Sequence, residues 1–379
     1  MRSIKTKLFS LGMAASMLLA LGGCAMSTPA NVGSIGGVEI PAGVYLLAQY
    51  NSYNTASGLA DLATGETAND VKTVLKAQCT GTINGEEVTT DGADYISQLA
   101  SHAIEYYAAV EKEFDELGGV LDDAATAEAA KTADSLWSSN GDLYTANGIS
   151  KSSVEAYLLN AQKAKVLLKM TYGPDGTSPV TDAEYTDYVN NDCYYVETVQ
   201  FPLVNYSSYS LATDDQKSQI EDIAAQCLAE LNEQATAETA SNSALYTAAM
   251  NYVPQAMSAM GSTIESAQAV YYAGSKLYTP NDLSSFGGDG YNNLTDPLDA
   301  AGMNHWTTID LGTTVLVARK IDPFKTYTVE DLDSMYDLLT SMKSDAIQDE
   351  LYTAGAALDH NLNSAAMNTY SASKIKKNV

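Results

Sequence analysis

The 379-residue sequence contains few of the residues from which metal sites and catalytic centres are usually built. It has three histidines (His102, His305 and His360) and four cysteines, which follow one another at irregular intervals. Such spacing provides neither a zinc-binding motif nor a disulfide framework. No nucleophile, base and acid recur together in a pattern that indicates catalysis. We therefore expect no metal and no cofactor, and the sequence assigns no catalytic residue.

Positive charge is also scarce. Lys and Arg total 20 against 47 Asp and Glu, which gives a formal net charge of −27. So acidic a surface repels the phosphates of nucleic acids, and beyond the first 23 residues Arg319 is the only arginine that could form a bidentate phosphate contact. The acidic residues are spread along the chain, which is typical of a solvated surface. We exclude nucleic acid as a partner.

The N-terminal apolar run, from Leu8 to Leu21, is shorter than the roughly 18 residues that a membrane-spanning helix needs. It follows a short basic start and precedes small residues, which is typical of an export signal. The letters L-G-G-C, ending at Cys24, resemble a bacterial lipobox, in which the cysteine is lipidated. An ordinary signal peptide with a chance cysteine is the alternative. We predict a signal peptide (1–23), a lipid anchor on Cys24 at the outer face of the bacterial cytoplasmic membrane, and a tether (24–34).

Hydrophobic spacing predicts a helical module over residues 35–190. A strand pair turned at Gly36 and Gly37 begins it. Helices should then begin at Pro41 and near Asp91, the second one stopping at Gly118. The remaining helices are expected over 70–78 and 122–138, after a capping box of Ser152 with Glu155, and after a capping box of Thr181 with Glu184.

A smaller α+β domain is predicted over 191–324, starting with a strand at Tyr194–Leu203. Its further elements are a helix capped by Thr213 and Gln216, a helix at 241–253, a strand at 268–272, a helical turn at 296–301, and strands at 306–311 and 314–321. Thr328 and Asp331 should cap one long helix within 325–379 that returns to the helical module. The predicted fold class is α+β, mainly helical, with the small domain inserted.

Four stretches carry a resemblance to a known family: V-G-S-I-G-G-V-E-I (32–40), N-G-I-S (147–150), F-G-G-D-G (286–290) and L-G-T-T-V-L-V-A-R-K-I-D (311–322). With the order of elements, they look like the SurA/PrsA-type foldases. In that family the N- and C-terminal segments build a chaperone module around an inserted parvulin-type peptidyl-prolyl isomerase domain. The resemblance implies an anchored extracytoplasmic chaperone whose partners are unfolded or exported polypeptides.

The sequence departs from that family at the isomerase centre. Active parvulins carry a histidine in the first strand and another in the last, and these positions fall here on Thr198 or Val199 and on or near Thr314. A threonine hydroxyl forms hydrogen bonds but cannot replace a two-nitrogen imidazole relay. The resemblance therefore implies weak or no isomerase activity. The candidate peptide-binding residues are Thr198, Phe201, Phe286, His305, Trp306 and Thr314.

Two alternatives stay open. One is an active prolyl isomerase in which threonines have replaced the histidines, and the other is a solute-binding or adhesive surface lipoprotein. The 25 Tyr and 12 Met suit loose binding of unfolded chains, because their side chains form broad, adaptable contacts. Most of them also lie on helical stripes, where they are equally explained as core residues.

Overall fold

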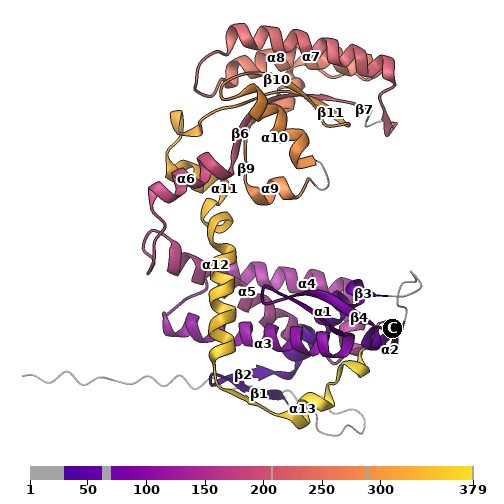
Figure 1. Cartoon of the computed structure of the whole chain (residues 1–379), viewed down its shortest axis with the longest axis vertical. Coiled ribbons are helices and arrows are strands. Elements are labelled where there is room, and N and C mark those ends of the chain that lie inside the picture. Colours follow the sequence, from indigo (N-terminus) through magenta and orange to yellow (C-terminus); the bar gives the residue numbers. More distant parts are fainter. Residues whose placement is uncertain (1–29, 62–69, 206–207, 287–289, 378–379) are drawn as a thin grey trace, which may run out of the picture.

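The computed structural model describes residues 30–61, 70–205, 208–286 and 290–377. Figure 1 shows two bodies along the long axis of the molecule. We call residues 30–172 with 338–377 the helical part, residues 194–321 the sheet part, and the two segments between them the junction. The fold is α+β and mainly helical, as predicted. The predicted signal peptide, Cys24 and most of the tether fall outside the described residues.

The helical part begins with a hairpin that also receives the end of the chain. Strands β1 (Asn31–Ile35) and β2 (Val38–Pro41) turn at Gly36 and Gly37, as predicted. Strand β12 (His360–Leu362), which the sequence did not predict, pairs antiparallel with β1. A Cβ on Gly33 would lie 2.4 Å from the Asn361 carbonyl oxygen, so only glycine permits this close approach.

Helix α3 (Gly92–Glu116) is the centre of the helical part, with α1 (Ala42–Leu59), α5 (Lys151–Tyr172) and α12 (Leu338–Ala357) packed against it. Much of its apolar face is buried, including Ile96 and Ile104, whereas Leu117 at its end is exposed. Helix α4 (Asp123–Ala146) runs eight residues beyond its predicted end and packs on α5. The prediction for the start of α5 was wrong, because Ser150 accepts the hydrogen bond from the backbone N–H of Ser153, so the cap lies two residues before Ser152.

A second small sheet lies beside α3. Strands β3 (Ala60–Asp61), β4 (Gln78–Ile83) and β5 (Glu86–Asp91) form it, and helix α2 (Val71–Lys76) precedes β4. The prediction included α2 but missed these strands, although Asn84 and Gly85 gave a turn signal. Both residues have positive φ, 52° and 75°, as a tight hairpin turn requires. Strand β5 alternates between more and less exposed positions, but its residues are mostly glutamate and threonine. The sequence therefore shows no alternation of apolar and polar residues there.

The sheet part is a four-stranded antiparallel sheet in the order β10-β11-β6-β9. Its strands are β6 (Tyr194–Pro202), β9 (Ala273–Tyr278), β10 (Thr307–Asp310) and β11 (Thr314–Lys320). The first and last strands, β6 and β11, pair antiparallel, with Thr198 opposite Ala318 and Thr314 opposite Pro202. The predicted strand at 268–272 was wrong, since Ser266–Tyr272 is a 3-10 helix and β9 follows it.

Helices cover both faces of this sheet (Figure 1). Helices α7 (Asp214–Gln234) and α8 (Asn242–Ala259) pack on one face, and α9 (Pro280–Ser284) and α10 (Gly290–Ala301) on the other. Thr213 and Gln216 form the predicted capping box of α7. A two-stranded ribbon, β7 (Val204–Asn205) with β8 (Ser210–Leu211), leads from β6 toward α7.

The junction contains α6 (Asp182–Asp192) and α11 (Val329–Tyr336), with a 3-10 turn at Pro323–Lys325. The capping boxes at Thr181 and Thr328 are present as predicted. The single long helix after Thr328 was wrong, because Asp337 takes a left-handed conformation, φ 49°, and separates α11 from α12. Helix α12 nevertheless returns to α3 and α5, as expected. Beyond β12 lie α13 (Ser364–Thr369) and a 3-10 turn at Ala372–Lys374.

A buried ion pair connects the sheet to the loop between α7 and α8. The side chains of Arg319 and Glu197 are both fully buried, with 2.7 Å between Nε and Oε2. The Arg319 guanidinium also donates to the carbonyls of Ala235 and Ala237 at 2.8 and 2.9 Å, and it stacks on Trp306. Arg319 is therefore a structural residue of the sheet part and is not available to bind phosphate.

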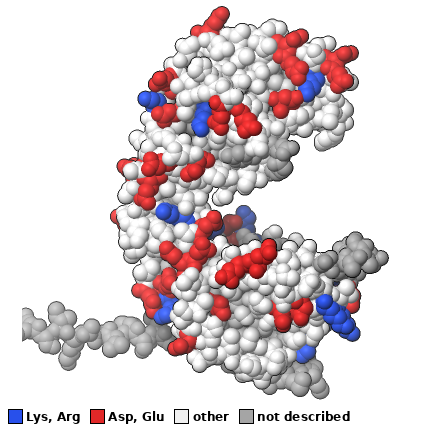
Figure 2. Space-filling view, in the orientation of Figure 1, with Lys and Arg blue, Asp and Glu red and all other residues white. Residues whose placement is uncertain are grey.

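Figure 2 shows a hollow between the two bodies, open on one side of the molecule. Acidic side chains are spread over both bodies in this view, and much of the surface around the hollow is uncharged. Together α12 and α11 connect the bodies along the closed side of the hollow. The fold thus leaves an inner surface that belongs to neither body alone.

Candidate functional site

The structure separates the candidate residues of the sheet part. Phe201 and Trp306 lie in the core beneath α7 and α8. Thr198 is two residues from Val196, and Thr314 is two residues from Leu316. Val196 and Leu316 belong to the cluster beneath α9 and α10, so both threonines lie on that face of the sheet, opposite Phe201. In the register of β6 and β11 the two threonines are four positions apart, roughly 13 Å along the strands. Their hydroxyls cannot act on one peptide bond.

The two remaining candidates are exposed. Phe286 is 43% exposed, and its ring centroid lies 5.9 Å from that of Tyr278. His305 is exposed, and its Nδ1 lies 2.9 Å from the Met303 carbonyl oxygen. Neither is near a paired acid, and the described residues include no group of three or more His, Cys, Asp or Glu that could hold a metal ion. The binding role of all six candidates stays a prediction.

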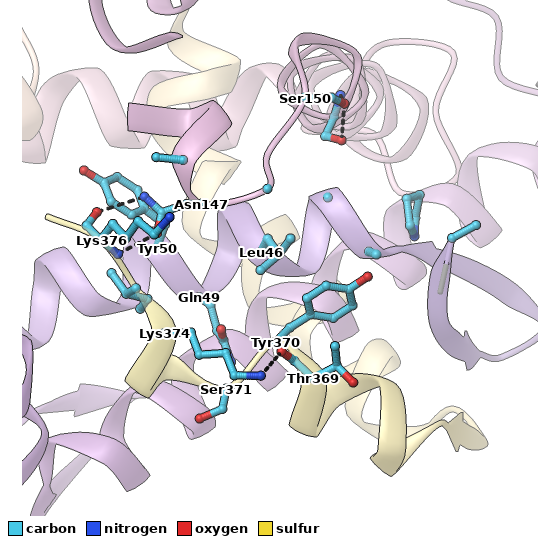
Figure 3. A pocket seen from close by; sticks show the side chains of 18 residues that line it. Leu46, Gln49, Tyr50, Asn147, Ser150, Thr369, Tyr370, Ser371, Lys374 and Lys376 are labelled. Atoms are coloured by element: carbon cyan, nitrogen blue, oxygen red, sulfur yellow. Dashed lines mark hydrogen bonds between the residues drawn. The ribbon is translucent and has the colours of Figure 1, made fainter. Parts of the chain in front are cut away.

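A pocket of about 570 Å³ lies where the start of α1, the turn between α4 and α5, and the end of the chain meet (Figure 3). We call it the polar pocket. Asn147 holds the end of the chain there, since its amide exchanges two hydrogen bonds of 2.8 Å with the backbone of Lys376. Lys374 Nζ donates to the Thr369 carbonyl, and Ser150 is 2.8 Å from Ser153. These groups already form hydrogen bonds with one another. The pocket is therefore better explained as the place where residues 369–376 are fixed to the helical part than as a binding site.

A second pocket, of about 450 Å³, lies between α5, α12 and α3. We call it the tyrosine groove. Most of its exposed lining is apolar, and it extends to Asp337, the residue that separates α12 from the junction. Its lining residues are Tyr106, Tyr157, Asn160, Ala161, Ala164, Lys165, Leu168, Lys169, Asp337, Thr340, Ser344, Ile347 and Gln348.

The residues of α5 that line the groove follow helical spacing. They run from Tyr157 to Lys169 at steps of one, three or four residues, so they share one face of the helix over about 18 Å. The sequence marked much of this face as a core stripe. In the structure only part of it is core, because Leu168 is buried, Tyr157 and Ala164 are half-buried, and Ala161 is exposed.

Tyrosine rings form one wall of the groove. The centroid of Tyr106 lies 4.8 Å from that of Tyr352, and burial raises the pKa of Tyr106 to about 12. Burial also raises the pKa of Tyr157 above its ordinary value. Both phenols are therefore neutral at physiological pH. They provide an apolar ring with a hydroxyl that can donate or accept a hydrogen bond.

Asn160 supplies a polar atom at the floor of this groove. The residue is 3% exposed, and its amide nitrogen donates to the Tyr107 carbonyl at 3.0 Å and to Glu111 Oε1 at 2.9 Å. Lys163 holds the other oxygen of Glu111 at 2.6 Å. Within the described ranges the Asn160 carbonyl oxygen has no partner. The arrangement holds the Asn160 carbonyl oxygen in a fixed position among apolar side chains, where it can accept a hydrogen bond.

The comparisons with known proteins include a weak structural likeness. No protein-family model matches the chain, and no curated protein matches it. The structure is similar to that of foldase protein PrsA from Streptococcus pneumoniae str. Canada MDR_19A, with a TM-score of 0.35 and 11% sequence identity over 77% of this chain and 98% of that one. This likeness is too weak to assign a fold or an activity. The functional conclusion therefore depends on the groove.

None of the helices in residues 30–61, 70–205, 208–286 and 290–377 is long and apolar enough to cross a membrane.

The sequence did not predict the tyrosine groove. Its one signal was that the α5 stripe is wider than a single packing contact needs, with tyrosine and alanine next to lysine on the same face. The partner surface on α12 lies more than 150 residues away in the chain.

Proposed function

We propose that the protein is an extracytoplasmic chaperone of the foldase type, which holds unfolded or exported polypeptides. The tyrosine groove is the observation that carries this proposal. It offers neutral phenol rings, aliphatic side chains and an unpartnered carbonyl oxygen, with few charged groups in its lining. Such a surface binds segments that expose apolar side chains and backbone N–H groups, as unfolded chains do.

The same lining argues against a defined small solute as the ligand. A solute site needs polar groups that converge on one enclosed molecule, whereas the exposed lining of this groove is mainly apolar and follows α5 over about 18 Å. The separation of Thr198 from Thr314 supports weak or no prolyl isomerase activity. We place the chain at the outer face of the cytoplasmic membrane, anchored through a lipid on Cys24.

Filling the groove tests the holding activity. Ala161→Trp should place a large side chain in it, because Ala161 is exposed in the lining. We expect the variant to lose most of the ability of the protein to suppress aggregation of an unfolded substrate, measured by light scattering at near-stoichiometric ratio. Ala127→Trp is the matched control, since Ala127 is an exposed alanine on α4 outside the groove. Equal suppression by both variants and the wild type would show that the groove does not hold polypeptides.

The anchor is tested separately. Cys24→Ser removes the atom that would carry the acyl chains, and stable membrane binding takes about two such chains. We expect the variant to be found in the soluble fraction of cells while the wild type stays with the membrane after a high-salt wash. Equal retention of both would contradict the anchor and leave the holding activity as a separate question.

A further inference from the structure

The charges at the edge of the tyrosine groove differ from those of the chain as a whole. The sequence carries a formal net charge of −27, yet the groove is lined by two lysines, Lys165 and Lys169, and one acid, Asp337. Both lysines are exposed. Within the described part of the chain neither forms an ion pair, whereas their neighbour Lys163 is held by Glu111. The groove edge is therefore a locally positive strip on an acidic protein.

The two lysines are placed to act together. They are four residues apart on α5, so they lie one helical turn from each other, with about 6 Å between their Cβ atoms. Ammonium groups on flexible stems at this separation can approach one carboxylate or two neighbouring ones. They stand beside Leu168 and Ala164, which belong to the apolar lining. A bound segment that places an apolar side chain in the groove would therefore bring its neighbouring residues to the lysines.

Asn160 adds a requirement on the backbone of the ligand. Its carbonyl oxygen can accept one hydrogen bond, while both amide hydrogens are already donated. In a helix all but the first four N–H groups are bonded internally, whereas an extended segment exposes N–H groups along its length. This acceptor thus favours an extended segment over a helical one.

We propose that the tyrosine groove selects extended polypeptide segments in which an aspartate or glutamate adjoins an apolar or aromatic residue. Lys165 and Lys169 bind the carboxylate, the tyrosine wall and Leu168 contact the apolar side chain, and the Asn160 oxygen accepts a backbone N–H. This inference rests on the proposed holding function and adds the class of segment that is held.

The test is fluorescence anisotropy of three labelled peptides with the full mature chain. The peptides share one unstructured sequence with a central phenylalanine and differ only in its two neighbours, which are aspartate, asparagine or lysine. We expect the aspartate peptide to bind roughly fivefold more tightly than the lysine peptide at low salt, and the difference to shrink at about 0.5 M salt because exposed charges are screened. N-methylation of the backbone nitrogen of the phenylalanine should make the aspartate peptide bind the wild-type protein more weakly than its unmethylated form does.

A charge-reversal pair with a matched control identifies the lysines. Lys165→Glu with Lys169→Glu should reverse the preference between the aspartate and lysine peptides. Lys72→Glu with Lys76→Glu changes the net charge equally, at two exposed lysines four residues apart on α2, and should preserve the preference. Equal binding of all three peptides, or equal effects of the two charge reversals, would overturn the selectivity and leave the holding function standing. If no peptide binds and Ala161→Trp changes nothing, the proposed function fails together with the selectivity.

Discussion

The sheet part and the helical part use their helices differently. In the sheet part the central strand β6 is buried from Tyr195 to Val199, because helices cover both faces of the sheet. In the helical part α5 and α12 meet at a corner and leave one face of α5 half-covered. The difference indicates that the sheet part has both faces covered, and that the helical part leaves the more accessible surface.

The closed sheet part should be the more sensitive to loss of a single polar side chain. Arg319→Leu leaves the Glu197 carboxylate buried without its cation and removes the donors to two loop carbonyls, so we expect the sheet part to lose about 4 kcal/mol of stability. Thiol labelling during urea unfolding can report this by region, since Cys227 is in the sheet core and Cys79 in the helical part. Cys227 should become reactive at lower urea, with Cys79 nearly unchanged.

Lys325→Ala is the control for that experiment, because Lys325 is an exposed cation in the junction. It should leave unchanged the urea concentrations at which Cys227 and Cys79 become reactive. A shift of both thiols by the same amount in Arg319→Leu would mean that the two parts unfold as one unit and that the comparison between them has no energetic basis.

The helical part should depend instead on apolar packing by the returning helix. Leu351 of α12 is fully buried, and Leu351→Ala should cost about 3 kcal/mol because it leaves a cavity. Met335 lies within the one long helix predicted after Thr328 but is 50% exposed near the end of α11, so Met335→Ala should change stability by less than about 0.5 kcal/mol. Urea midpoints would measure both, and similar losses would show that the break at Asp337 does not separate the two helices.

Alkaline pH should weaken the sheet part through its buried thiol. Burial raises the pKa of Cys227 to about 12 from an ordinary value of 9.0. The folded state keeps the thiol proton of Cys227 at pH values where the unfolded state loses it. The stability that this thiol contributes is therefore complete below about pH 9 and is lost as the pH rises toward 12. Between pH 8 and pH 10.5 we expect a loss of roughly 1–2 kcal/mol from this group. Cys227→Ala should lose correspondingly less over the same range, and identical pH profiles would contradict the assignment.

The smallest effect is expected for prolyl isomerisation. Single threonine hydroxyls about 13 Å apart cannot assemble a catalytic cluster. We expect the mature chain to leave the cis-to-trans rate of a proline peptide within roughly tenfold of the uncatalysed rate, measured by a protease-coupled assay. A much larger acceleration, retained in Ala161→Trp, would place an active centre in the sheet part and reverse the division of roles proposed for the two bodies.

Local signals in the sequence predicted the elements that depend on neighbours in the chain. The capping boxes at Thr181, Thr213 and Thr328 required only a hydroxyl and an acid or amide three residues later. Strand β12 could not be found in this way, because its partner lies more than 300 residues earlier. The left-handed break at Asp337 was also missed, because the apolar residues on both sides of it, such as Leu332 and Leu339, keep helical spacing across the break.

The candidate site was predicted less well than the fold. The spacing along α5 showed that Tyr157, Ala164 and Leu168 share one face. It could not show that α12 leaves this face partly open, because that depends on the angle at which two distant helices meet. Arg319 likewise carried no sequence signal of its burial, which comes from carbonyls in a loop about 80 residues away.

The pairing of β12 with β1 has a consequence for the order in which the molecule can fold. A chain made from its N-terminus completes every strand of the sheet part by Lys320, before α12 and β12 exist. Strand β1 pairs with β2 from the start, but its other edge has no strand partner until His360–Leu362 is present, and α12 supplies the second wall of the groove. Long-range pairing of this kind forms late, since loop closure must precede it. A chain that lacks α12 therefore lacks one wall of the groove.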